Sequence, residues 1–316
     1  MRALASLAAV WERQTPVLRG ILLMCCSTVA FAGMHALVRF VSEVLPPFQI
    51  AFFRNIFGLM FLLPLLMRSR FKVLRTQRIG LHALRGVINI GAMLMFFTAL
   101  SMSPLAKVTA LSFTAPIFMA VLAVLFLGER FRIYRWLAIL LGFAGMLIIL
   151  RPGVVAIDTG AILVLGSALL WAVAMLIIKI LSRTEQSVTT VAYMGIFLGI
   201  FSVFPAIWGW QPFTLQTLGW MALIGLFGTI AQMTLSQALK ETDPTALMPF
   251  DFLKLIWTAI LGAWFFAEIP DAFTWIGGAV IFASGLFIAY RERQARHATA
   301  LALTHSLKGQ FYDKRT

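Results

Sequence analysis

Two charged residues lie close together inside an apolar stretch that is long enough to cross a membrane. The stretch, residues 244–266, reads PTALMPFDFLKLIWTAILGAWFF and contains Asp251 and Lys254. Three positions apart on a helix, the two side chains lie on one face and partly neutralise each other. A charge at the centre of a spanning helix costs roughly 2.5–3.5 kcal/mol on insertion scales. The pair therefore either helps helices to pack or lines a polar cavity through which a solute passes.

Two arginines at membrane depth add positive charge that this pair does not balance. Arg54 lies well inside an apolar run, and Arg85 is followed at i+4 by Asn89. Counted with Asp251 and Lys254, the two guanidinium groups leave a surplus of positive charge inside the bundle, which carbonyls, water or an anionic ligand must offset. Each arginine is therefore either tied structurally to helix-end carbonyls or part of a site for an anion.

The candidate substrate-binding residues are polar or aromatic side chains within the apolar runs. They are Arg54, Arg85, Asn89, Lys107, Phe113, Trp171, Tyr193, Gln232, Asp251 and Lys254. The aromatic members are also common packing residues, whereas the Gln232 amide needs hydrogen-bond partners in a dry environment. Arg39 is expected to extend toward the membrane interface. His35 is either a proton relay or an interior histidine.

The composition is that of a protein with many membrane spans. Hydrophobic residues make up 61% of the 316 residues and charged residues 12%, and the mean hydropathy is +0.92. A soluble domain with this balance could not cover its surface with polar groups. The net charge of +14 falls in short loops and tails without stacking aromatic residues, which argues against nucleic acid. The adjacent Cys25 and Cys26 are interpreted as packing residues rather than a redox or disulfide pair.

Apolar runs of spanning length predict ten helices. The runs begin near Arg19, Pro46, Gly80, Pro104, Arg132, Thr159, Val188, Thr214, Pro244 and Ala272. With the N-terminus inside, Lys and Arg concentrate in the inner loops and the tails, and Arg151 alone lies in an outer loop. This bias places both termini in the cytoplasm.

The two halves of the chain repeat each other. Phe113 and Glu129 recur as Phe252 and Glu268, each 139 residues later. Each half holds five predicted helices, and an odd number inverts the second copy in the membrane. The predicted fold is therefore an all-α integral membrane protein of ten transmembrane helices in two inverted five-helix repeats. The expected divisions are a cytoplasmic segment at 1–18, the repeats at 19–151 and 152–290, and a basic cytoplasmic tail at 291–316.

Two prolines predict interrupted helices at corresponding places in the repeats. Pro116 and Pro249 each lie within an apolar run, the fourth and the ninth. Proline removes an i to i−4 hydrogen bond and frees a carbonyl. Interrupted helices at matching positions are typical of the substrate site of a transporter, and the alternative is a pair of packing kinks.

Short motifs in both halves resemble one family of membrane carriers. They are AFFR at 51–54, LRG at 84–86, SFTAP at 112–116, LGER at 127–130, PFDF at 249–252 and AEIP at 267–270. In their order and spacing they resemble the EamA family of the drug/metabolite transporter superfamily, over nearly all of the chain outside the two tails. Within that family the chain is most similar to carriers of S-adenosylmethionine and riboflavin and to organic-anion carriers.

The resemblance implies a multi-pass secondary transporter of the bacterial inner membrane that works by alternating access. With the charge surplus, the expected substrate is a small organic metabolite that is anionic or zwitterionic. The resemblance implies coupling to protons or to a counter-substrate, or simple facilitation, in a monomer or homodimer. S-adenosylmethionine, riboflavin and amino acids are alternative substrates. A membrane enzyme or a channel is the rival class, but no catalytic motif or pore-lining ring supports either. No cofactor or metal is expected.

Overall fold

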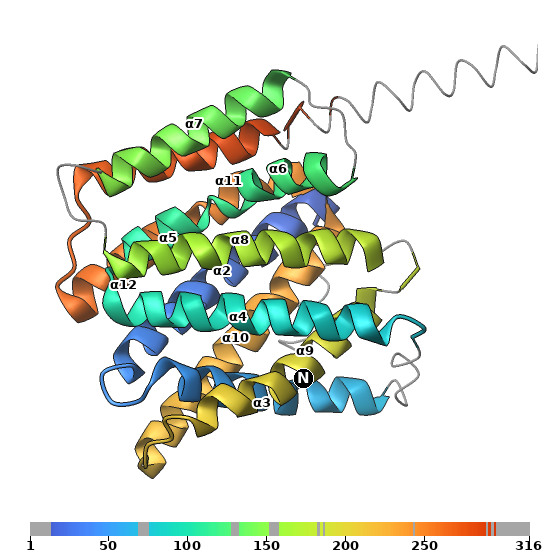
Figure 1. Cartoon of the computed structure of the whole chain (residues 1–316), viewed down its shortest axis with the longest axis vertical. Coiled ribbons are helices and arrows are strands. Elements are labelled where there is room, and N and C mark those ends of the chain that lie inside the picture. The colour runs from blue at the N-terminus through green and yellow to red at the C-terminus, as the bar shows by residue number, and fades with distance from the viewer. Residues whose placement is uncertain are drawn as a thin grey trace, which may run out of the picture.

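The described part of the chain is helical nearly throughout. The computed structural model describes residues 14–68, 76–127, 133–151, 158–181, 184–185, 187–242, 244–288, 290–291 and 294, and no strand occurs among them. The helices are α2 (Pro16–Val41), α3 (Pro47–Arg68), α4 (Ile79–Met102), α5 (Leu105–Ser112), α6 (Ala115–Leu127), α7 (Ile133–Leu150), α8 (Thr159–Leu181), α9 (Ser187–Ile207), α10 (Leu215–Glu241), α11 (Pro244–Asp251), α12 (Leu253–Phe266) and a last helix at Ala272–Ile288. They form one bundle (Figure 1).

The outside of the bundle is apolar, as a lipid-facing surface must be. Phe126 is 70% exposed, Phe204 74% and Trp264 81%. In the described ranges, 7 helical segments are long and apolar enough to cross a membrane, and three shorter apolar helices accompany them. Lipid satisfies exposed apolar side chains but no backbone polar group, so helices are the expected form. The prediction of a nearly all-helical membrane protein is confirmed.

Two of the spans are broken near their middle. The span Leu105–Phe126 consists of α5 and α6, which are separated by a turn at Phe113 and Thr114. In the same way, α11 and α12 are separated at Phe252. Pro116 is the second residue of α6, where the missing N–H of proline costs nothing. Pro249 lies inside α11, two residues before its end. The two breaks therefore fall a few residues away from the prolines.

Two serine hydrogen bonds join the helices that pack most extensively. The hydroxyl of Ser27 on α2 donates to the carbonyl of Ala231 on α10 at 2.8 Å. The hydroxyl of Ser167 on α8 donates to the carbonyl of Ala92 on α4 at 2.7 Å. Small residues at such contacts let helix backbones approach closely. The pair α2–α10 and the pair α4–α8 are thus held by the same kind of contact.

The last helix packs directly against α7, as Figure 1 shows. A Cβ on Gly277 would lie 2.6 Å from the carbonyl oxygen of Gly145 and 2.5 Å from Cγ1 of Ile149. These distances are shorter than real Cβ contacts, so only glycine fits at this crossing. The two helices therefore meet backbone to backbone.

The ends of several helices follow from their flanking residues. Thr15 before α2 and Thr214 before α10 each accept a hydrogen bond from the backbone N–H three residues later. Ala267 ends α12 in the left-handed conformation with φ 53°, which is uncommon for a residue with a side chain. The turn lets the N–H of Glu268 donate to Gly262 at 3.0 Å. It also brings the Glu268 carboxylate back to the end of the bundle.

Candidate functional site

The two helix breaks meet in the interior of the bundle. Phe113 and Phe252, one at each break, stack with their ring centroids 6.0 Å apart and their planes 28° apart. Both rings also contact Phe282 of the last helix, at 5.9 Å and 4.8 Å. The ammonium of Lys254 lies 5.0 Å from the centre of the Phe113 ring. Its Nζ is 3.3 Å from Oδ1 of Asp251. This central cluster combines an apolar platform with one cation and one carboxylate.

His35 lies on α2, the helix that packs against α12. It is 6% exposed, and its ring centroid lies 5.0 Å from that of Phe96 and 6.2 Å from that of Phe31. No described residue supplies a hydrogen-bond partner for its Nδ1. An imidazole nitrogen without a partner in a dry interior costs free energy, so this ring is not a fully satisfied interior histidine.

Arg54 is held against α10 without a carboxylate. Its Nη1 donates to Oδ1 of the neighbouring Asn55 at 2.8 Å, and Asn55 donates in turn to the Leu198 carbonyl of α9 at 3.4 Å. Gly228 of α10 leaves room for the Arg54 guanidinium, because a Cβ at this position would lie 3.0 Å from Nε of Arg54. Within the described residues, Nε has no partner and no carboxylate lies within ion-pair distance of Arg54.

Arg85 is buried between α4 and α9. Its Nη1 donates to the carbonyl of Thr190 at 2.9 Å, and its Nη2 lies 3.2 Å from the sulfur of Met194. The carbonyl contact matches the structural tie that was one of the two alternatives for this residue. Asn89, one turn further along α4, is also buried at 4% exposure. Arg85, like Arg54, has no carboxylate partner among the residues that the structure describes.

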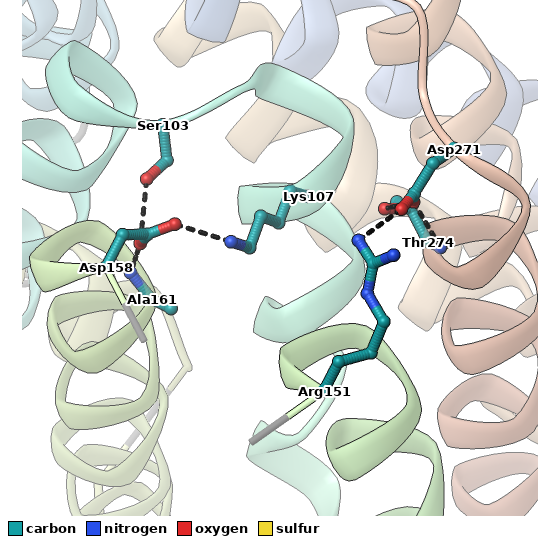
Figure 2. A network of polar contacts seen from close by, with 7 residues as sticks. All are labelled: Ser103, Lys107, Arg151, Asp158, Ala161, Asp271 and Thr274. Carbon is teal, nitrogen blue, oxygen red and sulfur yellow. Dashed lines mark hydrogen bonds and ion pairs between the residues drawn. The ribbon is translucent and has the colours of Figure 1, made fainter. Parts of the chain in front are cut away.

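Lys107 does not lie in the central cluster. Figure 2 shows its side chain extended toward Asp158, and the Nζ to Oδ2 distance is 2.5 Å. The other oxygen of Asp158 accepts from Ser103 at 3.1 Å and from the backbone N–H of Ala161 at 2.6 Å. Asp158 precedes α8, and an aspartate at this position caps a helix. Lys107 is therefore engaged at one end of the bundle.

A second ion pair lies beside the first (Figure 2). Nη2 of Arg151 is 2.5 Å from Oδ2 of Asp271, and Oδ1 of Asp271 accepts from the backbone and the hydroxyl of Thr274. Burial raises the pKa of both Asp158 and Asp271, but the hydrogen bonds and neighbouring cations outweigh it, so each pKa lies below its usual value. A lowered pKa stabilises the fold above the ordinary aspartate value of about 4, and the contribution is lost as the pH falls further.

A third ion pair corrects the expectation for Arg39. This side chain does not extend freely to the interface: Nη2 is 3.1 Å from Oε1 of Glu268, and Nη1 donates to the Leu100 carbonyl at 3.1 Å. The other oxygen of Glu268 accepts from the N–H of Leu105, the first residue of α5, at 2.8 Å. A carboxylate at a helix N-terminus is favourable. Arg39 is therefore held in an ion pair rather than extended as a free side chain.

The remaining sequence candidates lie on helices other than those that carry the central cluster. Trp171 is 42% exposed on α8, and Gln232 is half-buried on α10. Tyr193 on α9 stacks on His82 of α4 with the centroids 4.7 Å apart. The structure thus brings together Phe113, Asp251 and Lys254. Lys107 contacts Asp158 instead, and Arg85 contacts α9.

Sequence reasoning missed several of these contacts. Phe252 was available as the repeat partner of Phe113, and Asp158 as a capping residue directly before an apolar run. Glu268 was noted only as a repeat match and as part of the AEIP motif. His82 carries no sequence signal of its own, because its burial depends on which helix α4 faces.

Comparisons with known proteins agree with this architecture. The model of the EamA-like transporter family matches residues 18–151 and 158–290. The S-adenosylmethionine uptake transporter of Rickettsia bellii is 30% identical over 269 residues, covering 85% of this chain and 92% of that protein. The riboflavin transporter of Rhizobium johnstonii is 32% identical over 284 residues, covering 89% and 94%. One solved structure matches with a TM-score of 0.59 at 17% identity, covering 87% of this chain and 98% of that one, and so shares the fold.

Apolar helices arranged around buried charges define a membrane-embedded protein of the transporter class. This chain belongs to the EamA-like transporter family. The relatives are named as transporters of small molecules rather than as enzymes, as the sequence resemblance implied.

Proposed function

We propose that this protein is a secondary transporter that moves a small anionic or zwitterionic metabolite across the bacterial inner membrane by alternating access. The observation that carries this proposal is the excess of cations inside the bundle. Within the central cluster, Lys254 is paired with the carboxylate of Asp251. Neither Arg54 nor Arg85 has a carboxylate partner in the described part of the chain. An anionic group on the substrate completes the charge balance in a medium of low dielectric constant.

Ten helices in two inverted repeats, 19–151 and 152–290, are the architecture proposed for this transport. The two matches of the family model support a duplicated chain. The hydrogen bonds of Ser27 and Ser167 support it further, because Ala231 lies 139 positions after Ala92 and Ser167 lies 140 after Ser27. Equivalent residues thus make equivalent contacts. Alternating access then consists of rocking one repeat against the other around the central cluster.

Three alternative substrates are kept beside this general class. The names of two relatives specify S-adenosylmethionine and riboflavin, and an amino acid is a third alternative for this chain. Coupling is to protons or to a counter-substrate, and the transporter works as a monomer or homodimer in the lipid bilayer. A channel or a membrane enzyme is the rival function, and no observation favours either.

A ligand screen followed by a transport assay tests this function. An anionic or zwitterionic metabolite present at about 100 times its Kd should stabilise the purified protein by roughly 2.7 kcal/mol in thermal unfolding. The same compound should show saturable counterflow in proteoliposomes, and its uncharged amide or ester should show neither effect. Stabilisation by pure cations alone would contradict the proposal.

Cysteine labelling tests the proposed orientation. With both termini in the cytoplasm, Ser42→Cys in the first loop should react with a membrane-impermeant maleimide added outside intact cells. Arg70→Cys, in a segment outside the described residues, should react only after the membrane is opened. Both variants are made in a background in which the free cysteines Cys25 and Cys26 are replaced by serine, and this background protein is the unlabelled control. Labelling of both positions from the same side would contradict this topology.

A further inference from the structure

The contact between α4 and α9 contains a row of buried polar groups. His82, Arg85 and Asn89 are spaced i, i+3 and i+7 on α4, so they lie on one face of that helix. Their exposures are 1%, 5% and 4%. Between them, Gly86 lets the helices approach, because a Cβ there would lie 2.5 Å from Cβ of Phe197 on α9. The row is therefore enclosed by α9 rather than by solvent.

Several polar atoms in this row have no hydrogen-bond partner among the described residues. They are Nδ1 and Nε2 of His82 and Nε of Arg85. Buried polar groups in folded proteins are satisfied in the great majority of cases, so three orphaned atoms within one helical turn require an explanation. A neutral imidazole has one donor and one acceptor, and the Arg85 Nε–H is a donor. At least two N–H donors thus lack an acceptor.

The charge at this place points to what is missing. The Arg85 guanidinium is oriented by the Thr190 carbonyl and the Met194 sulfur, neither of which is a counter-ion. Glu185 lies two residues before α9, and its Oε1 accepts a hydrogen bond from Thr76 at 2.6 Å. Tyr193 covers one face of the His82 ring. Water could supply an acceptor but not the negative charge that a buried guanidinium favours.

The geometry points to a second anion-binding site between α4 and α9, built from His82 and Arg85, for a carboxylate or phosphate group. In the proposed orientation it lies near the cytoplasmic end of α4, away from the Lys254 cluster. This inference rests on the proposed transport function: the site holds the anionic group of the metabolite on the cytoplasmic side. Guanidinium Nε–H and imidazole N–H donors in this arrangement form charge-assisted hydrogen bonds with such a group.

Histidine NMR of the full-length protein provides the test. The chain has 4 histidines, so ¹⁵N-histidine labelling gives few signals, and His82→Phe and His35→Phe assign the two that belong to the bundle. The probes are acetate, inorganic phosphate and, as an uncharged match, acetamide, in phosphatidylcholine nanodiscs. Acetate or phosphate should shift the ring nitrogens of His82 saturably, and acetamide should not.

Substitutions assign the effect to Arg85. Arg85→Gln should weaken the acetate or phosphate shift at His82 by about tenfold or more, because it removes the charge. Arg19→Gln is the matched control, since Arg19 is already paired with Glu241 at 3.0 Å. If Arg85→Gln does not fold, Arg85→Lys keeps a charge without the Nε donor and should also weaken the shift. Unchanged affinity in the Arg85 variant that folds, or an equal response to acetamide, overturns the inference.

The two histidines separate this inference from the proposed function. Shifts confined to His35 would overturn the α4–α9 site. Counterflow measured in the same protein would still support the proposed transport function. No shift at either histidine together with no counterflow would contradict both. A shift of His82 produced by replacing phosphatidylcholine with phosphatidylglycerol, without added anion, would support the anion site but assign its occupant to a lipid headgroup.

Discussion

Replacing Asp251 with asparagine should reduce net transport by about tenfold or more while leaving substrate exchange within about twofold of the unchanged protein, since tenfold corresponds to about 1.4 kcal/mol. In the proposed mechanism, the anionic substrate neutralises Lys254 in the loaded carrier. In the empty carrier that role falls to the Asp251 carboxylate, 3.3 Å away. Without it, the empty carrier must move a half-buried ammonium whose remaining described contact is the Phe113 ring. Because exchange never requires the empty carrier to reorient, it should be spared.

The measurement is efflux into buffer compared with counterflow, both in proteoliposomes of equal protein content. Asp271→Asn is the matched control, because Asp271 is paired with Arg151 outside the central cluster. It should change the two modes in proportion. Equal loss of net transport and exchange in Asp251→Asn, or no loss in either, would show that the Asp251–Lys254 pair serves helix packing.

A single added methyl group at Gly277 should destabilise the protein by roughly 1–3 kcal/mol, the usual cost of overpacking. The new Cβ would lie 2.6 Å from the Gly145 carbonyl oxygen, a backbone atom that cannot rotate away. The last helix must therefore move off α7. Thermal unfolding in detergent, together with the yield of monodisperse protein, measures the effect of Gly277→Ala.

Gly219→Ala is the control for this substitution and should have the opposite sign. Gly219 also lies within a helix, α10, but nothing lies within 4 Å of its added Cβ. Alanine there gains up to about 1 kcal/mol of helix propensity without a steric cost. Equal unfolding temperatures for the two variants would mean that the contact between α7 and the last helix is looser than described.

Local patterns in the sequence predicted the features that depend on spacing within one helix. The position of Asp251 three residues before Lys254 was enough to place the two side chains together. The prolines located the two breaks to within a few residues. The breaks themselves lie at Phe113 and Phe252. Pro116 is tolerated near the start of α6, so the chain turns before it, and Pro249 lies near the end of α11, so the chain turns after it.

Contacts between helices could not be predicted in the same way. Lys107 was a candidate for the central cluster, but its partner Asp158 lies 51 residues later in the chain. Trp171 was a candidate as an aromatic residue within an apolar run, and it lies on α8 with 42% of its surface exposed. These helices carry apolar residues on nearly all of their own faces. Hydrophobic periodicity therefore does not specify which face meets protein and which meets lipid. That choice is made by packing against other helices.

In the part of the chain that the structure describes, the ion pairs at the ends of the bundle all join a cation of the first half to a carboxylate of the second half. In each, the cation comes from before residue 152 and the carboxylate from after residue 157. The pairs are Arg39–Glu268, Lys107–Asp158, Arg151–Asp271 and Arg19–Glu241. A first half expressed alone would present unmatched positive charges to another first half, and two second halves would present unmatched carboxylates. Like charges opposed in this way repel. If the gene were split between the repeats, the two fragments would therefore assemble with each other in preference to copies of themselves.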